Sequence, residues 1–382
     1  MLKLNIFLKT VHIYKSYKSV FNIILDLFKN YKISDFMSST KDYNLIGKGS
    51  YSVVLSPPIT NVLPTQWYLK YNDPLNNDVS KVYKTNDFED FETEFYILTE
   101  YVMKIENYDN FTVKIKGASR FYLDEIQNKK IVELLEVNRC GGKLIEMQQI
   151  IFENGGIQIN KYCDLFTFSE SLKLILNFYK GLKLLNTYNI IHRDVKPTNV
   201  LYKNNKLLLI DFGLSCHVND VYNWVKSDFI LSNKYTFSPP EFFIYYLFKK
   251  YNVICHSDID LFLKTMEENG SSVRKDVSTY YEKHWFQYNQ GIHDVAKYYN
   301  GIREICQSIK ENKNIYDYFS NDLAKKTDVY SSSYIIKTMI TKTFFKTKSE
   351  ENLFEQLYEM SSIFDPLKRF SIQDLIDKIE EY

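Results

Sequence analysis

Apolar residues recur at helical spacing in two stretches of the chain. In the first stretch they fall on one helical face, at Val20, Ile23, Ile24, Leu27 and Phe28. The second stretch, residues 169–189, repeats this spacing at Leu172, Ile175, Leu176, Tyr179, Leu182 and Leu185. Each spacing predicts an amphipathic helix. The second helix is expected to be buried core, and residues 350–382 are read as two closing helices.

Several strand-like segments lie in the first half of the chain. Residues 43–55 and 79–84 have this character. Between them, residues 56–78 contain several prolines and asparagines, which predicts a long loop. Residues 111–150 are strand-like again, with a turn expected at Gly141-Gly142.

The composition describes a chain that can bury a sizeable core. Its 382 residues are enough for two or three domains, and 45% of them are apolar. The formal net charge of +1 gives no electrostatic case for nucleic-acid binding, so no nucleic-acid partner is expected.

The cysteines are widely scattered and form no C-x-x-C motif: Cys140, Cys163, Cys216, Cys255 and Cys306. Zinc binding is therefore not expected. An odd number of distant cysteines fits reduced thiols, which predicts an intracellular, cytoplasmic protein.

The first 36 residues carry lysines among apolar residues. The apolar run is too short and too interrupted to span a membrane, and no small-residue cleavage site follows it, so a secretory signal is not expected. A basic amphipathic helix can lie on an anionic membrane. We favour the alternatives, in which residues 1–36 pack on the rest of the chain or form a loosely ordered extension.

The chemistry of the chain is concentrated in residues 190–213, which read I-I-H-R-D-V-K-P-T-N-V-L-Y-K-N-N-K-L-L-L-I-D-F-G. Asp194 follows apolar residues, so we expect it at the mouth of a core, where it could accept a proton from an incoming hydroxyl. Asn199 and Asp211 supply oxygen donors, which Mg²⁺ prefers. Each residue alone would be read as a polar turn residue. Their joint spacing, with Lys196 between them, indicates metal-assisted transfer of a charged group.

The pattern H-R-D-x-K-P-x-N followed by D-F-G resembles the catalytic and metal-binding loops of eukaryotic-type protein kinases, and its Lys-Pro pair resembles their serine/threonine branch. The resemblance implies an α+β, two-lobed fold with a small β-rich N-lobe, residues 43–154, and a larger helical C-lobe, residues 155–382. It also implies ATP and Mg²⁺ as cofactors, a protein substrate, and transfer of the γ-phosphoryl group to serine or threonine hydroxyls.

The same resemblance assigns a role to each residue of this stretch. Asp194 orients or deprotonates the acceptor hydroxyl, and Lys196 steadies the transferred group. Asn199 and Asp211 hold Mg²⁺.

Residues 43–55 resemble the glycine-rich loop of kinases, G-x-G-x-x-G-x-V. Gly47, Gly49 and Val54 match it, and Ser52 replaces the third glycine. Glycines let backbone N–H groups approach phosphates closely, although a plain hairpin turn would look much the same. The residues expected to contact the nucleotide here are Ile46, Gly47, Lys48, Gly49, Ser50, Tyr51, Ser52, Val53 and Val54. The S-P-P that follows resembles divergent kinases encoded by large DNA viruses, which would place the protein in a host cell or a virion.

One lysine should hold the α- and β-phosphates of ATP and pair with a glutamate on the following helix. Lys81 is preferred, because D-V-S-K-V-Y-K aligns it with the family pattern V-A-I-K-V-Y-K, while Lys84 and Lys70 remain candidates. Glu94 matches the family pattern E-x-x-I-L, with Glu92 as the alternative.

Residues 150–156 read I-I-F-E-N-G-G and resemble the last strand of the small lobe and the hinge. Phe152 would be the gatekeeper residue, and residues 153–155 would offer backbone groups to adenine. A plain strand and turn is the alternative.

The S-P-P-E that ends at Glu241 resembles the A-P-E motif that closes the kinase activation segment, the residues between Gly213 and Glu241. Arg369 is the matching late arginine, so a buried Glu241–Arg369 pair is expected. Arg193 implies regulation by phosphate on this segment, because guanidinium binds phosphate bidentately. The hydroxyls available there are those of Ser227, Ser232 and Thr236. Lys234 stands where serine/threonine kinases have a threonine, which leaves the acceptor preference open.

Asp328 resembles the aspartate that braces the catalytic loop from a later helix, although Ser333 stands where a glycine is usual. In the family this helix follows soon after the closing motif, so residues 242–327 form an insertion. A helical elaboration is its expected role, and partner docking is the alternative.

The expected function is ATP-dependent serine/threonine protein phosphorylation. The alternative is a pseudokinase that acts as a binding or scaffold module. Ser52, Lys234 and Ser333 favour this alternative, and the complete set of chemical residues opposes it. A small-molecule kinase of related fold is a third possibility, which the serine/threonine-type motifs oppose.

Overall fold

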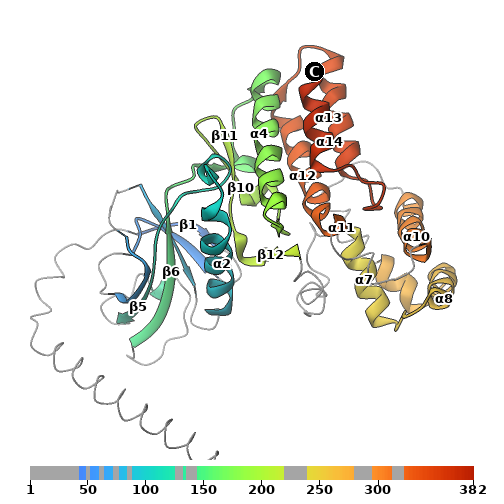
Figure 1. The fold of residues 1–382 in the computed structure, drawn as a ribbon, viewed down its shortest axis with the longest axis horizontal. Helices are drawn as coiled ribbons and strands as arrows, with labels where there is room; N and C mark the ends of the chain where they lie inside the picture. Colours follow the sequence, from blue (N-terminus) through green and yellow to red (C-terminus); the bar gives the residue numbers. More distant parts are fainter. Residues whose placement is uncertain are drawn as a thin grey trace, which may run out of the picture.

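The computed structural model describes residues 43–48, 52–59, 64–71, 77–83, 88–124, 132–134, 144–218, 239–278, 295–311 and 322–382. These residues form the predicted α+β arrangement of two lobes (Figure 1). Strands and helix α2 (Phe88–Glu100) make up one lobe, and helices dominate the other. Expectations that lie outside the described residues concern the helix around residues 20–28, the turn at Gly141-Gly142, and Ser227, Ser232, Lys234 and Thr236.

The small lobe is built on an antiparallel six-stranded sheet with the order β1-β2-β4-β6-β5-β3. Its strands are β1 (Asn44–Lys48), β2 (Ser52–Ser56), β3 (Pro64–Leu69), β4 (Val79–Tyr83), β5 (Ile115–Asp124) and β6 (Leu144–Phe152). Successive side chains of a strand point to opposite faces. One face of this sheet therefore buries a core that includes Val53, Val82 and Phe121, while α2 packs on the other face.

The prediction of a loop over residues 56–78 is wrong for Pro64–Leu69, which forms edge strand β3 and pairs with β5. Trp67 and Tyr68 are residue types that favour strands, and their contribution outweighs that of the neighbouring prolines. Pro64 is compatible with this assignment because it is the first residue of an edge strand, where Pro is tolerated.

Aromatic rings join α2 to the sheet. The ring centroid of Tyr68, on β3, lies 5.4 Å from that of Phe91 and 5.7 Å from that of Phe95. Phe91 and Phe95 stack on each other at 5.6 Å, and the Tyr83 ring of β4 meets Phe91 edge to face at 5.4 Å. Each such pair adds about 0.5–1.5 kcal/mol beyond the area it buries. Aromatic contacts from two strands, β3 and β4, therefore fix the position of helix α2 on the sheet.

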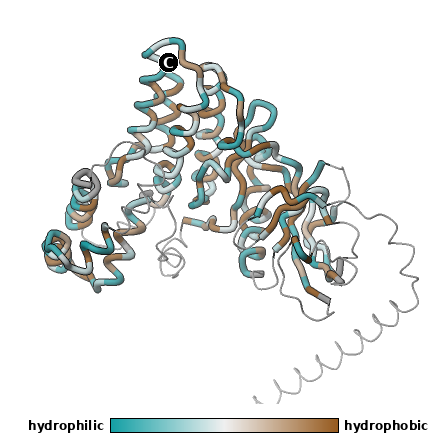
Figure 2. The backbone as a smooth tube through the Cα atoms, turned by 180° about the vertical axis from the view of Figure 1, so that it is seen from behind, coloured by the Kyte–Doolittle hydropathy of each residue, from teal (hydrophilic) through white to brown (hydrophobic). Residues whose placement is uncertain are grey.

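Helix α4 (Phe168–Thr187) runs through the large lobe where its apolar spacing predicts a helix. A capping box fixes its start: Thr167 Oγ1 accepts from the Glu170 backbone N–H, and the Glu170 carboxylate accepts from that of Thr167. The apolar faces of α12 (Thr327–Lys342), α13 (Lys348–Ser361) and α14 (Ile372–Glu380) share a core with α4. This confirms the two closing helices, along which apolar and hydrophilic positions alternate (Figure 2).

A tight hairpin forms within the stretch that carries the chemistry. Strand β10 (Val200–Lys203) pairs with β11 (Lys206–Leu209). Asn204 and Asn205 between them both have positive φ angles, which a two-residue hairpin turn of this kind requires and which asparagine tolerates. The remaining short strands are β7 (Ile157–Gln158), β8 (Phe166–Thr167), β9 (Ile190–Ile191), β12 (Cys216–His217) and β13 (Thr343–Phe344).

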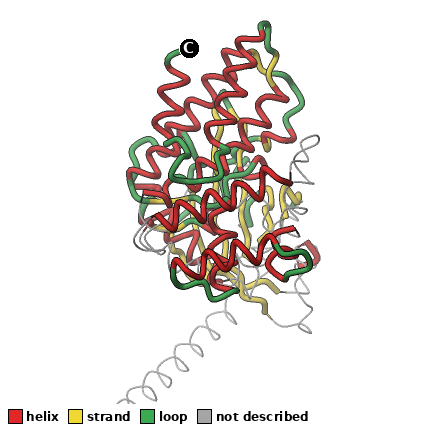
Figure 3. Tube along the Cα trace, turned by 90° about the vertical axis from the view of Figure 1, so that its right-hand side faces the viewer, coloured by secondary structure: helices red, strands yellow, loops and turns green. Residues whose placement is uncertain are grey.

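The described parts of residues 242–327 are helical, as expected of a helical elaboration. The named helices in and beside this segment are α7 (Pro240–Lys250), α8 (His256–Glu267), α10 (Val295–Glu311) and α11 (Asp322–Lys325). They build a second core that includes Phe248, Phe262 and Ile305. In Figure 1, α7, α8 and α10 lie at the end of the large lobe away from the sheet, and Figure 3 views helices from that side with strands behind them. No helix in the described ranges is both long and apolar enough to cross a membrane.

Candidate active site

The candidate catalytic loop begins where β9 pairs with β12, with Ile191 opposite Cys216. The next residue, His192, is fully buried, and its Nε2 lies 3.1 Å from the Ile210 carbonyl oxygen. The Asp194 backbone N–H donates to His192 Nδ1, so the ring is neutral with its proton on Nε2. Burial lowers the pKa of His192 to about 3. This imidazole is therefore a structural link and not a proton carrier.

Asp194 is buried, with 4% of its surface exposed. Lys196 Nζ lies 2.9 Å from each carboxylate oxygen, and Asn199 Nδ2 donates to Oδ2 at 2.8 Å. Apart from this ion pair with Lys196, Oδ1 accepts no hydrogen bond from the described residues, so it keeps a lone pair that can accept a proton. Burial raises the pKa of Asp194 to about 7, against the effect of Lys196 and with a contribution from Asp211. Such a carboxylate exchanges protons near neutral pH.

Asn199 and Asp211 are brought together by the β10–β11 hairpin, across which the Ile210 backbone N–H donates to the Asn199 carbonyl at 2.9 Å. Asn199 Nδ2 donates to Asp194 Oδ2 and to the Asp194 backbone carbonyl, so the amide oxygen is left for a cation. Together with the Asp211 carboxylate it forms a donor set that suits a hard divalent cation. Mg²⁺ is commonly held by one or two protein groups plus nucleotide phosphates. The described residues contain no larger cluster of His, Cys, Asp or Glu that could hold a metal.

Lys81, on β4, joins the two lobes. Its Nζ lies 2.5 Å from Glu94 Oε2 on α2 and 2.7 Å from Asp211 Oδ1. The predicted pairing of Lys81 with Glu94 is therefore present. Lys70 is exposed just beyond the end of edge strand β3, and Lys84 lies outside the described residues.

The charges at this corner shift one another's pKa values. Burial opposes the charge on Lys81, but Asp211 and Glu94 outweigh it and raise the pKa of the ammonium. Burial also opposes the charge on Asp211, yet Lys81 lowers its pKa below the usual range. Asp211 additionally adopts a left-handed backbone, with φ of 70°. That conformation is uncommon away from glycine and frequent at functional sites.

The glycine-rich loop is described only in part. Gly49, Ser50 and Tyr51 lie outside the described residues, while Ile46, Gly47 and Lys48 end β1 and Ser52, Val53 and Val54 begin β2. Val54 is paired with Lys81 across β2 and β4, so the two side chains share one face. Val53 points the other way and packs in the core of the small lobe.

The segment predicted to be the hinge leads from the sheet into the large lobe. Phe152 ends β6 and is 8% exposed. The Glu153 backbone N–H donates to the Lys114 carbonyl at 2.9 Å, and its carboxylate pairs with Lys203 at 2.7 Å. Gly156 has a φ of +92°, a backbone conformation that side chains rarely adopt. Residues 153–156 form an irregular connection between β6 and β7, which is compatible with both the hinge and its alternative.

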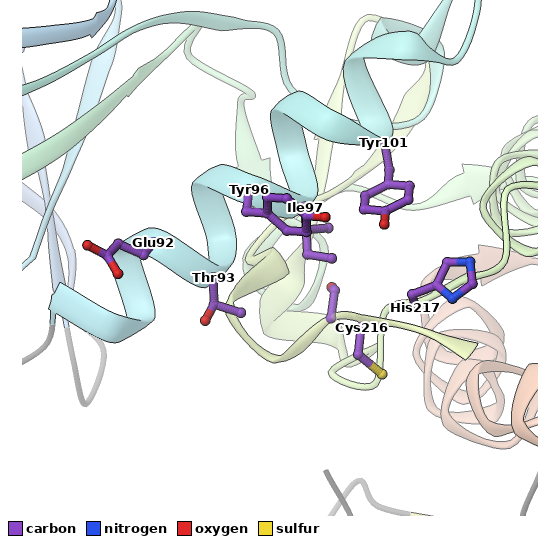
Figure 4. A pocket seen from close by; sticks show the side chains of 8 residues that line it. Glu92, Thr93, Tyr96, Ile97, Tyr101, Cys216 and His217 are labelled. Carbon is purple, nitrogen blue, oxygen red and sulfur yellow. The ribbon is translucent and has the colours of Figure 1, made fainter. Parts of the chain in front are cut away.

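Glu92, the alternative to Glu94, lies on the outer side of α2. There it helps to line an open pocket of about 450 Å³ between α2 and the residues around β12. Figure 4 shows Tyr101 on the side of α2 that lies nearest to Cys216 and His217, and Glu92 at the other end of the helix segment. The lining residues are Glu92, Thr93, Tyr96, Ile97, Tyr101, Ser215, Cys216 and His217. Since Glu94 carries the ion pair with Lys81, the structure favours Glu94.

Asp328 accepts hydrogen bonds from the backbone N–H groups of His192 and Arg193, at 2.7 and 2.8 Å. The predicted brace between α12 and the catalytic loop is confirmed. Arg193 has a φ of 67°, and the Asp328 carboxylate helps to hold this strained backbone in place.

The predicted pair of Glu241 and Arg369 is also confirmed. Arg369 Nη1 donates to Glu241 Oε1 at 2.8 Å and Nη2 to Oε2 at 2.9 Å, and both residues are buried. Arg369 further donates to the carbonyls of Ile363, Lys326 and Phe364. The pair links the start of α7 to the segment before α14.

One contact of the site does not follow from any motif. Tyr83 donates a hydrogen bond to Glu94 Oε2. The sequence feature that could have indicated this contact is strand alternation, which puts the side chains of Lys81 and Tyr83 on the same face of β4.

The pKa of Asp194 leads to a prediction about pH. If Asp194 accepts the proton of the acceptor, kcat/KM for transfer should fall about tenfold per pH unit below about pH 7, because the protonated carboxyl cannot act. The measurement is a pH series with an acceptor peptide that has no group titrating in this range, with circular dichroism confirming that the chain stays folded. A flat profile between about pH 6 and 8 would contradict this role.

Comparisons with known proteins agree with this geometry. The family profile of the protein kinase domain matches residues 102–262. This match contains the catalytic loop, Asp211 and Glu241, and it begins after Lys81 and Glu94. The assignments of Lys81 and Glu94 therefore rest on the ion pair and on the resemblance of their local motifs.

Individual relatives match shorter segments. The chain is 33% identical over 94 residues to a cell division control protein 2 homolog of Trypanosoma brucei brucei, which covers 24% of this chain and 30% of that protein. It is 35% identical over 96 residues to a probable cyclin-dependent kinase of Dictyostelium discoideum, covering 24% and 26%. It is 43% identical over 56 residues to the human cell division cycle 7-related protein kinase, covering 14% and 10%. The matches thus span less than a third of each relative's length.

Proposed function

We propose that this chain, which has the α+β two-lobed protein kinase fold, transfers the γ-phosphoryl group of ATP to serine or threonine hydroxyls of a protein substrate. The main observation in support is that charged side chains from both lobes come together at one site. Lys81 of the small lobe reaches Asp211 of the large lobe at 2.7 Å, beside the buried Asp194. Protein kinase relatives carrying serine/threonine names support the acceptor class.

The charge of each site residue determines its proposed role in the transfer. Asp194 accepts or orients the acceptor proton through Oδ1, and Lys196, 2.9 Å from both of its oxygens, neutralises charge on the transferred group. Lys81 supplies a fixed cation for nucleotide phosphates, since Glu94 and Asp211 raise its pKa. Asp211 and the Asn199 amide oxygen would hold a divalent cation, for which we propose Mg²⁺ and which supplies charge neutralisation when bound. Catalysis of this kind is mostly placement and electrostatics.

The acceptor is tested with matched peptides. Three basic peptides that differ only in a central serine, threonine or tyrosine are incubated with the purified chain, Mg²⁺ and ATP labelled on the γ-phosphate. We expect label in the serine and threonine peptides and at least about tenfold less in the tyrosine peptide. Label in the tyrosine peptide alone would overturn the acceptor class. Label in none of the peptides, and none on the chain itself, would favour the pseudokinase alternative.

The remaining sequence predictions stand as proposals of the same kind. They are the likeness to kinases of large DNA viruses, the intracellular location, the absence of a nucleic-acid partner, and the boundaries of the lobes and of the insertion at 242–327. Membrane contact through residues 1–36 is the less favoured alternative, and those residues lie outside the described part of the chain.

A further inference from the structure

The ion pair between Lys81 and Glu94 has additional partners. The Tyr83 hydroxyl donates a hydrogen bond to Glu94 Oε2, the same oxygen that faces Lys81 Nζ. The Phe212 backbone N–H donates to the other oxygen, Oε1, at 3.2 Å. Glu94 is 1% exposed, so its charge depends on protein donors in place of water.

Tyr83 is held in place by the fold around it. It lies two residues after Lys81 on β4, so both side chains leave the same face of the sheet, toward α2. Its ring meets Phe91 edge to face at 5.4 Å, and Phe91 precedes Glu94 by three residues on α2, which puts the two on one helical face. Tyr83 is 1% exposed, and the ring packing fixes where its hydroxyl points.

The Tyr83 hydroxyl acts as a donor at physiological pH. Burial, with a contribution from Glu94, raises the pKa of Tyr83 well above its usual value, so the phenol keeps its proton. The Lys81 ammonium lies 5.4 Å from the Tyr83 ring centroid, a distance at which a cation is attracted to the ring face. Tyr83 therefore contacts both members of the ion pair.

We propose that Tyr83 is a positioning residue for phosphoryl transfer, whose hydroxyl fixes the plane of the Glu94 carboxylate and thereby the place of the Lys81 ammonium. The inference rests on the proposed function. Lys81 lies between two acids, Glu94 at 2.5 Å and Asp211 at 2.7 Å. A carboxylate held from one side by Tyr83 and from the other by the Phe212 N–H cannot rotate to follow the ammonium toward Asp211. Placement errors of about 1 Å at such a site cost on the order of 10²-fold in rate.

The test is Tyr83→Phe, which keeps the ring against Phe91 and removes only the hydroxyl. We expect kcat to fall about tenfold while KM for an acceptor peptide stays within about twofold. Tyr179→Phe is the matched control. Tyr179 is also fully buried, and its hydroxyl lies 3.1 Å from Ser332 Oγ in the large lobe. It should have a similar effect on the midpoint of thermal unfolding and leave kcat unchanged.

A double-mutant cycle separates positioning from general destabilisation. If Tyr83 acts through Glu94, then Tyr83→Phe should cost nothing further in a Glu94→Gln background, because the carboxylate that it positions is gone. If instead the fold-reduction of kcat in the double variant equals the product of the two single-variant reductions, the inference is overturned. A Tyr83→Phe variant with wild-type kcat, or a Tyr179→Phe variant that loses as much activity, would also overturn it.

A failure of the proposed function would be visible separately. If the wild-type chain shows no Asp194-dependent transfer, the readout becomes its affinity for Mg-ATP, measured by calorimetry. Weaker binding in Tyr83→Phe, again absent in the Glu94→Gln background, would support the positioning role for nucleotide binding alone. Equal affinities would overturn it.

Discussion

Replacing Asp194 with asparagine is expected to lower the rate of phosphoryl transfer by about 10²- to 10⁴-fold, the range in which a positioned acid or base contributes. The affinity for Mg-ATP should stay within about threefold of wild type, because Lys81 and Asp211 are unchanged. Transfer is measured by label in a peptide and binding by calorimetry.

The stability of the Asp194→Asn variant should not fall. Because the pKa of Asp194 is about 7 in the folded chain and 3.8 when unperturbed, its presence lowers the free energy of unfolding progressively between about pH 4 and pH 7, and the full cost is present above about pH 7. A neutral amide of the same shape removes that cost, along with the repulsion from Asp211. Asp374→Asn serves as the control, since Asp374 is an exposed residue whose carboxylate belongs to the capping box at the start of α14. A loss of transfer in both variants, or unfolding of Asp194→Asn, would contradict a chemical role for Asp194.

Replacing Arg369 with alanine is expected to lower the free energy of unfolding by about 3–5 kcal/mol, because it leaves the buried Glu241 carboxylate without its bidentate partner. The change also removes donors to three backbone carbonyls and the stacking of the guanidinium on the Tyr330 ring at 5.0 Å. Urea unfolding followed by circular dichroism measures the difference.

Arg303→Ala is the matched control for Arg369→Ala. Arg303 also makes a two-point contact with a glutamate, Glu267, but both side chains are substantially exposed, at 42% and 56%. Exposed pairs of this kind contribute about 0–1 kcal/mol. Adding Glu241→Gln to Arg369→Ala should recover part of the loss, since the stranded charge is then removed. Equal decreases in the free energy of unfolding for Arg303→Ala and Arg369→Ala would contradict a larger contribution from the buried pair.

The parts of the site that follow from sequence are those set by local spacing. Asp194, Lys196 and Asn199 lie within six residues of one another, so a single loop fixes their geometry once β9 and the β10–β11 hairpin form. The Glu241–Arg369 pair spans 128 residues, yet each member carries its own short motif, which is why the pair is predictable.

The features that do not follow from sequence depend on partners far along the chain. Pro64–Leu69 becomes a strand because β5 offers a free edge and because Tyr68 can reach Phe91 and Phe95 on α2. The sequence of residues 64–69 does not show that β5 has an unpaired edge with which this segment can pair. The role of Tyr83 cannot be predicted from sequence for the same reason, because its hydrogen bond to Glu94 depends on how α2 packs against β4.

The most direct test of phosphoryl transfer by this chain is a single-turnover experiment with the wild-type chain in excess over ATP labelled on the γ-phosphate. Samples are quenched over time with Mg²⁺ and a serine peptide present, and a parallel series omits the divalent cation. We expect that label leaves ATP and appears in the peptide in equal amount, and that it stays in ATP when the cation is omitted. Label that remains in bound ATP throughout, with Mg²⁺ present, would contradict phosphoryl transfer and leave a nucleotide-binding module.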